Sequence, residues 1–317
     1  MTIYKYRKRG YCWNCGKRTS HQDNQDKYFC LECSMKSIEN TLDEREKEII
    51  SKLNKSKLSI DEIDIILSSK SPCIKNTGIR HDYKKNHVKL GIIADMHIGS
   101  KYFNEAGFKY SRDTFEKEKV DAIYCPGDII EGMSQRDGQI YDLSDLGYTE
   151  QLEHAYKLLN TLNKPFFFIT GNHDMWGRNK GNMGLQVGKE VQKNVPNAKY
   201  LGDMEADILL NNKLKLRLTH RGNTSYALSY SGQKYINGLE GGTKPEVIVN
   251  GHLHKSLYMQ YRNIHYLEAG TIQNQSEFMA MKGSPAMVGF WILDLQFDKE
   301  KICSFKPEWF PIYTKLP

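Results

Sequence analysis

Five short polar blocks, each at the end of an apolar run, constrain the fold of this chain more than any other feature. Four of them end the strand-like runs LGIIAD, AIYCPGD, FFFITGN and VIVNGH, and the fifth ends KLRLTH. In open α/β sheets, side chains that leave the carboxyl ends of neighbouring strands converge although they are distant in sequence. The blocks supply carboxylate, amide and imidazole groups from Asp95, His97, Asp128, Asn172, His173, Asp174, His220, His252 and His254.

The segments between the blocks predict an α/β fold. Helices are expected over residues 104–119 and 148–162, and a strand-like run follows each of them, which indicates a parallel sheet. The second half is richer in strands. There we expect hairpins that turn at Asn211-Asn212 and Arg262-Asn263, a helix over 225–239, and closing strands over 287–297 and 301–310. Elements in this order fit two packed sheets with helices outside.

The donor groups of the blocks are suited to metal ions. Carboxylate, amide and imidazole ligands gathered at strand ends can hold two metals a few ångströms apart, and such a pair clamps an in-line displacement at phosphorus. Nitrogen and oxygen ligands without thiolate suit Mn, Fe or Zn better than Ca. The blocks could therefore hold metal ions, and a pair of them would suit chemistry at phosphorus.

In this order and spacing, the five blocks resemble those of the calcineurin-like metallophosphoesterases, over roughly residues 88–295. The resemblance implies a four-layer αββα sandwich with a dimetal centre, and Mn²⁺ as its metal. It also implies that a hydroxide bridging the two metals attacks the phosphoester. By position, the ligands of the family's first metal correspond to Asp95, His97 and His254. Its bridging carboxylate corresponds to Asp128, and the ligands of its second metal correspond to Asn172, His220 and His252.

Three residues beside the expected ligands have further expected roles, and the resemblance implies that of His173. His173 stands where the family contacts the phosphate and can protonate the leaving oxygen, which suits an imidazole at neutral pH. Arg221 is expected to stabilise phosphate charge, although the family often has glycine directly after His220 and here Gly222 comes one residue later. Asp174 is expected either to orient a histidine or to cap its loop.

A cysteine module precedes the predicted catalytic domain. The pairs in Cys12-x2-Cys15 and Cys30-x2-Cys33 are close to the spacing of a four-cysteine structural zinc site. A redox CxxC is the alternative, and two pairs without an adjacent βαβ pattern argue against it. Aromatic and basic residues around the cysteines suit nucleic acid, while a structural or protein-docking ribbon explains them equally well.

The sequence predicts four segments: a zinc module over 1–38, a helical segment over 39–70, a linker over 71–87 and the phosphoesterase domain over 88–317. The helical segment reads either as a helix-turn-helix or as a plain helical hairpin. Residues 1–88 carry 18 Lys and Arg against 12 Asp and Glu, which accounts for six of the seven net positive charges. This excess indicates a polyanionic partner such as DNA, or a solvated basic tail.

These observations favour a phosphodiesterase that acts on DNA as a nuclease, similar to the DNA-repair-exonuclease branch of the family and its phage-type relatives. The alternatives are a phosphatase or phosphodiesterase on nucleotides or other small phosphoesters, and a nucleic-acid-binding adaptor with a vestigial site. No apolar run approaches the ~18 residues of a membrane helix, and no signal segment follows the basic start. We therefore expect a cytoplasmic protein without a membrane partner. The sequence does not indicate an oligomeric state.

Overall fold

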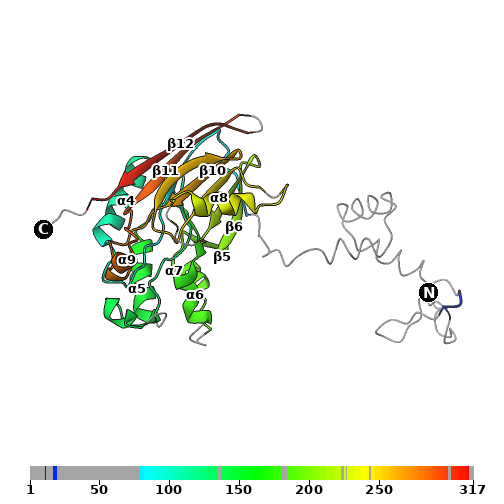
Figure 1. The fold of residues 1–317 in the computed structure, drawn as a ribbon. Helices are drawn as coiled ribbons and strands as arrows, with labels where there is room; N and C mark the ends of the chain where they lie inside the picture. Colours follow the sequence, from blue (N-terminus) through cyan, green and yellow to red (C-terminus); the bar gives the residue numbers. More distant parts are fainter. Residues whose placement is uncertain are drawn as a thin grey trace. The chain divides into compact units, whose positions relative to one another are not determined.

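The computed structural model divides the chain into two units, Met1–Cys73 and Ile74–Pro317. It describes residues 79–133, 137–179, 184–222, 227–242, 244–298 and 301–313, with Tyr11, residues 17–19 and Ser225. The four cysteines of the predicted zinc module and the expected helical segment over 39–70 lie outside the described residues. The fold described below is that of the second unit (Figure 1).

The first sheet has the strand order β12-β11-β2-β3-β4-β5. Strands β2 to β5 run parallel, whereas β11 pairs antiparallel with both β2 and β12. The parallel βαβαβ arrangement expected from the sequence is therefore confirmed. The strands of this sheet are β2 (His87–Ile92), β3 (Ala122–Cys125), β4 (Phe166–Thr170), β5 (Ala198–Asp203), β11 (Gly289–Phe297) and β12 (Ile302–Pro311).

The second sheet has the strand order β1-β6-β7-β8-β10-β9. Both predicted hairpins are present, because β6 pairs antiparallel with β7 and β9 with β10. At each turn, two residues have positive φ, at 49° and 55° for Asn211 and Asn212 and at 50° and 62° for Arg262 and Asn263. This left-handed backbone suits a tight hairpin turn, with three residues between the paired ends of β6 and β7 and two between those of β9 and β10. The strands are β1 (Ile79–His81), β6 (Glu205–Leu210), β7 (Leu214–Thr219), β8 (Val247–Asn250), β9 (Ser256–Tyr261) and β10 (Ile264–Ala269).

Strand β1 lies within the segment 71–87, for which a linker was expected. It pairs in parallel with β6, with Ile79 opposite Ile208. Three residues are too few to show the alternation that marks a strand, so the pairing depends on a neighbour far along the chain.

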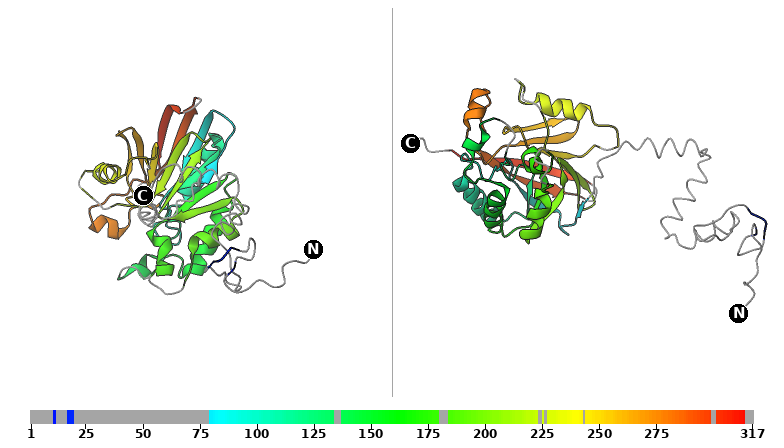
Figure 2. Two further views of the ribbon diagram at one scale, coloured as in Figure 1. Left: turned by 90° about the vertical axis from the view of Figure 1, so that its right-hand side faces the viewer. Right: turned by 90° about the horizontal axis from the view of Figure 1, so that it is seen from below.

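Helices cover the outer faces of both sheets (Figures 1 and 2). Residues of α4, α5 and α7 pack with β3 and β4 in one apolar cluster, and α8 packs on β8 and β10 in another. Asn104 caps α4 by accepting a hydrogen bond from the backbone N–H of Gly107 at 2.7 Å. The helices are α4 (Glu105–Lys117), α5 (Tyr148–Leu159), α6 (Asn172–Asn179), α7 (Val187–Asn194), α8 (Tyr230–Asn237) and α9 (Glu277–Met281), with a 3₁₀ turn at Gln139–Asp142.

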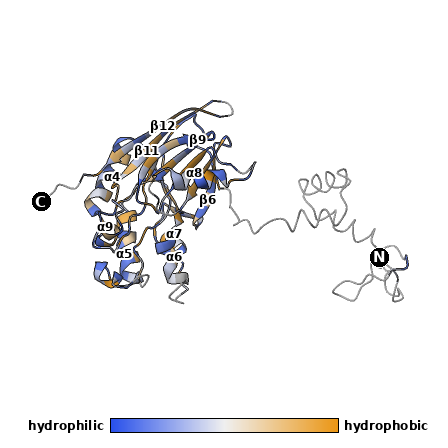
Figure 3. Ribbon diagram, viewed as in Figure 1, coloured by the Kyte–Doolittle hydropathy of each residue, from blue (hydrophilic) through white to orange (hydrophobic). Residues whose placement is uncertain are grey.

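A second large apolar core lies between the two sheets. Along β3, Ala122 and Tyr124 face this core, while Ile123 and Cys125 face the helices, because successive side chains of a strand point to opposite faces. Apolar residues accordingly gather along the strands in Figure 3. The α/β fold of two mixed sheets flanked by helices confirms the expected sandwich. Within the described part of the chain, no helix is long and apolar enough to cross a membrane.

Candidate metal centre

The polar blocks meet where the strands of both sheets end. Asp95, Asp128 and Asn172 follow β2, β3 and β4, while His220 follows β7 and the last two histidines follow β8. Among the described residues, three groups could hold a metal ion, each with ligand atoms within 4.8 Å of one another. The groups are Asp95, His97 and His254; Asp128, His220 and His252; and His97, Glu131 and His173.

The first group coincides with the ligands expected for the first metal. The Nε2 atoms of His97 and His254 lie 3.0 Å apart, and His254 Nε2 lies 3.4 Å from Asp95 Oδ1. All three residues are buried, with exposed fractions of 8% or less. The three donors therefore face a common point that is shielded from bulk water.

The second group contains His220 and His252, two of the three ligands expected for the second metal, and the third, Asn172, contacts both. His220 Nε2 lies 3.0 Å from Asp128 Oδ2 and 3.1 Å from Asn172 Oδ1, and His252 Nδ1 lies 2.8 Å from the same amide oxygen. Asp128 Oδ2 is also 3.8 Å from His97 Nε2 of the first group. Asp128 thus lies between the two groups, where a carboxylate could bridge two cations.

The chemistry of these donors fits a cation. His220 Nδ1 lies 2.7 Å from the carbonyl oxygen of Pro126, which can only accept, so this nitrogen carries the proton. In the neutral ring, the Nε2 lone pair then faces the oxygens of Asp128 and Asn172, and three acceptors converge. A proton or a metal must lie among them. Without a metal the proton takes that place, because the charge of Asp128 outweighs burial, which alone would lower the pKa, and raises the pKa of His220 to about 9.

The backbone is held in an unusual conformation at the same residues. Five of the block residues have φ in the left-handed region, where residues other than glycine are uncommon. Such conformations cluster at functional sites, where the surrounding fold holds them in place. The residues and their φ angles are Asp95 (47°), His97 (52°), Asp128 (52°), His252 (81°) and His254 (54°).

Two glycines allow the ligand loops to approach one another. A Cβ atom on Gly171 would lie 2.6 Å from His220 Nε2, and one on Gly251 would lie 2.7 Å from the carbonyl oxygen of Pro126. Neither position has room for a side chain. The glycines of the GNHD and GHLH blocks therefore serve the close packing of the ligands.

His173 lies beside the first group, as expected for a residue that contacts the substrate. Its Nδ1 donates to the carbonyl oxygen of Glu131 at 2.7 Å, and its ring centroid is 4.4 Å from that of His97. Burial lowers the pKa of His173 to about 4, against the opposing charge of Asp128. The ring is therefore neutral at pH 7 and its Nε2 can accept a hydrogen bond. In this neutral form, Nε2 of His173 carries no proton that it could donate to a leaving oxygen.

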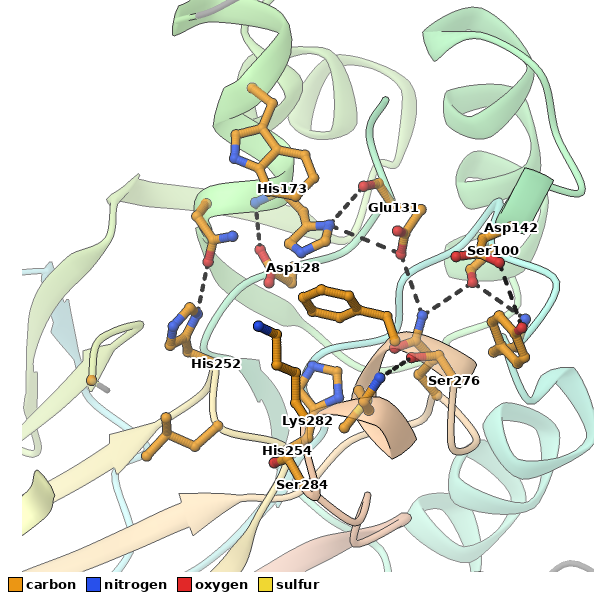
Figure 4. Close-up of a pocket in the computed structure, with 18 residues that line it drawn as sticks. Ser100, Asp128, Glu131, Asp142, His173, His252, His254, Ser276, Lys282 and Ser284 are labelled. Atoms are coloured by element: carbon orange, nitrogen blue, oxygen red, sulfur yellow. Dashed lines mark hydrogen bonds and ion pairs between the residues drawn. The ribbon is translucent and has the colours of Figure 1, made fainter. Parts of the chain in front are cut away.

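A cavity of about 680 Å³ opens over the two groups. Asp128, Asn172, His252 and His254 line it together with His173. Figure 4 shows the side chains of Asp128, His173, His252 and His254 turned towards the same space. This volume lies within the range of sites that bury most of a small ligand.

The chain matches the sequence pattern of the calcineurin-like phosphoesterases over residues 88–256. It belongs to this family.

Two curated relatives of this chain are named DNA polymerase II small subunit. The protein of Methanothermobacter thermautotrophicus is 22% identical over 240 residues, which cover 62% of this chain and 49% of the relative. The protein of Thermoplasma acidophilum is 24% identical over 266 residues, which cover 68% of this chain and 53% of the relative. The chain spans about half the length of these relatives.

Solved structures similar to this chain include a novel archaeal phosphodiesterase and Yfce, a phosphoesterase from E. coli. The first is 14% identical with a TM-score of 0.40, and covers 70% of this chain and all of its own. The second is 16% identical with a TM-score of 0.39, and covers 69% and 98%. At these TM-scores the two structures carry no weight for the function.

Two acidic residues hold the predicted ligands or their loops in place. Glu131, which the sequence did not single out, accepts a hydrogen bond from His97 Nδ1 at 2.9 Å; this contact outweighs burial and lowers the pKa of Glu131 to about 2. Only its position shortly after Asp128 could have indicated it. Asp174 caps its loop, one of the two roles expected, because it accepts the N–H groups of Ile129, Ile130 and Gly171 at 2.9–3.0 Å.

Arg221 does not lie where its expected role requires. Its Nε lies 3.4 Å from Glu205 Oε2, and its side chain lines a second cavity with Tyr230 and Lys234, apart from the ligands. Asn250 holds the backbone here, accepting from the N–H of Arg221 and donating to its carbonyl oxygen. His220 therefore lies among the predicted ligands, while the next residue, Arg221, lies beside Glu205.

Proposed function

We propose that this chain is a dimetal-dependent phosphodiesterase that cleaves DNA. The observation that carries the proposal is the pair of ligand groups that share Asp128 at the base of a cavity. The relatives named DNA polymerase II small subunit support DNA as the substrate rather than a phosphoprotein.

Two divalent cations, with Mn²⁺ expected, would supply Lewis-acid activation of water and neutralise charge at phosphorus. Asp95, His97 and His254 would hold one cation, and Asn172, His220 and His252 the other, with Asp128 shared. His173 directs Nε2 towards the substrate, because its Nδ1 is engaged by the backbone of Glu131. Asp174 fixes the loops after β3 and β4, so the ligands keep their places through turnover.

The predicted N-terminal segments remain part of this proposal. Cys12, Cys15, Cys30 and Cys33 would hold a structural zinc ion over residues 1–38. The basic excess of residues 1–88 would attract the DNA backbone, so that binding weakens as salt increases.

The test is cleavage of labelled single- and double-stranded DNA with Mn²⁺. The wild-type chain should cleave at least one of these substrates, and excess chelator should stop it. Asp128→Asn should abolish cleavage, whereas Asp113→Asn, at an exposed position of α4, should leave it unchanged. A fully active Asp128→Asn variant would refute the role of Asp128 as a bridge, and a wild-type chain inactive with every divalent metal would refute the nuclease.

Hydrolysis of a small phosphoester is the second candidate function, because a cavity of about 680 Å³ is the size of a small-molecule site. Comparing the rates at which the chain hydrolyses a chromogenic phosphate diester and the corresponding monoester distinguishes diesterase from phosphatase activity. An inactive chain that still binds DNA would instead indicate an adaptor.

A further inference from the structure

One wall of the cavity consists of side chains that take no part in holding the cations. Phe278 and Met279 of α9 line it, and so does Lys282, which directly follows the helix. Phe278 is 40% exposed although it is a large apolar side chain beside a buried polar site. Exposed aromatic surface inside a cavity is characteristic of a binding site.

Two more aromatic side chains, Trp176 and Tyr102, line the same cavity. The Trp176 ring packs against His173, with centroids 3.7 Å apart. His173 is the residue expected to contact the phosphate, so an aromatic surface begins directly beside that position. A phosphate alone has no apolar part that would use this surface.

Lys282 adds a positive charge to the aromatic wall. Its Nζ lies 5.8 Å from the centroid of the Phe278 ring. Within the described residues, no carboxylate oxygen lies within 4.0 Å of this Nζ. Figure 4 shows the side chain reaching into the cavity beside His254, so its charge is available to a ligand.

We propose that Phe278 stacks on a nucleobase adjacent to the scissile phosphate and that Lys282 contacts a phosphate oxygen of the same strand. The ligand class is a nucleoside phosphodiester with an unpaired base, as in a single strand. Base stacking on an aromatic ring changes binding by roughly 5- to 150-fold per base. This inference rests on the proposed phosphodiesterase function, and it selects single strands over duplexes.

The experiment uses a single-stranded oligonucleotide whose cleavage position is mapped with the wild-type chain. Matched strands then carry an abasic residue on either side of that position. Phe278→Leu should lower kcat/KM on the intact strand by about 5- to 150-fold and change it less than about twofold on one abasic strand. Tyr313→Leu, at an 85% exposed aromatic outside this cavity, is the matched control and should act as wild type. Lys282→Gln should raise KM and reduce the salt dependence of binding.

A second readout does not depend on turnover. The fluorescence of 2-aminopurine at the position beside the cleaved bond should be quenched when the strand binds to the wild-type chain, and less so with Phe278→Leu. If the wild-type chain had equal kcat/KM on the intact and abasic strands, the base contact would be overturned while the phosphodiesterase activity stood. The same conclusion would follow if Phe278→Leu lowered kcat/KM equally on both strands. A chain with no phosphodiesterase activity would refute the proposed function instead, and absence of quenching would then also refute the base contact.

Two further substrates identify the source of the base. A 3′,5′-cyclic nucleotide hydrolysed better than the strand would keep the stacking contact but assign it to free nucleotides. A phosphotyrosine peptide preferred over every nucleotide would overturn the inference.

Discussion

Replacing Glu131 with glutamine tests whether a buried carboxylate outside the predicted ligand set governs the affinity for metal. Glu131 is 4% exposed and accepts the Nδ1–H of His97, a predicted ligand of the first metal, at 2.9 Å. Two amides, from Gln139 and Gln273, donate to its oxygens at 3.0 and 3.3 Å. Glutamine retains the shape of this side chain and removes the charge that orients and polarises the imidazole.

The expected magnitude follows from these contacts. A hydrogen bond to a charged group contributes about 1.5–3 kcal/mol. Loss of a carboxylate that orients a histidine ligand typically lowers metal affinity by about 10- to 100-fold, or about 1.4–2.8 kcal/mol. Both estimates agree, so Glu131→Gln should weaken Mn²⁺ binding by about 10- to 100-fold. Because the pKa of Glu131 is about 2, the carboxylate stays charged at neutral pH.

Isothermal titration calorimetry with Mn²⁺ on the purified chain measures this effect directly, and circular dichroism checks that the fold is kept. Glu118→Gln is the matched control, because it removes the same charge from a surface pair with Lys89. An unchanged Mn²⁺ affinity in a folded Glu131→Gln variant would refute the reasoning.

Two other predictions concern a glycine and a buried histidine. Gly171→Ala should weaken Mn²⁺ binding in calorimetry although every ligand is kept, because its Cβ would lie 2.6 Å from His220 Nε2; Gly241→Ala, with no atom within 4 Å, should have no effect. Burial lowers the pKa of His81 from 6.5 to about 4, so stability holds above pH 6.5 and declines as the pH falls towards about 4. His81→Phe should reduce that decline in urea denaturation, and an identical pH dependence in the variant would contradict this account.

The sequence was sufficient to predict the sandwich and the convergence of the ligand blocks. Asp95, Asp128 and Asn172 follow runs of buried strand residues, and the ends of parallel strands must meet at one edge of a sheet. The hairpins were predictable for a similarly local reason, since Asn211-Asn212 accepts the left-handed backbone that a tight turn requires.

Other features depend on contacts that no local pattern records. Glu131 lies three residues after Asp128 in an apolar stretch, and only the folded chain brings it to His97. Arg221 was expected at the substrate because it adjoins His220, but adjacency does not give the direction of a side chain. Strand β1 becomes a strand only through its pairing with β6.

The division of the predicted ligands between two sheets has a mechanical consequence. Asp95, His97, Asp128 and Asn172 extend from the first sheet, and His220, His252 and His254 from the second, with an apolar core between the two sheets. Cations held by both sets would act as a cross-link at one end of that interface, so separating the sheets would require releasing the metal. A free metal concentration of 100 times Kd would add about 2.7 kcal/mol to the free energy of unfolding. The cations would thus stabilise the packing of the two sheets in addition to supplying the chemistry of the site.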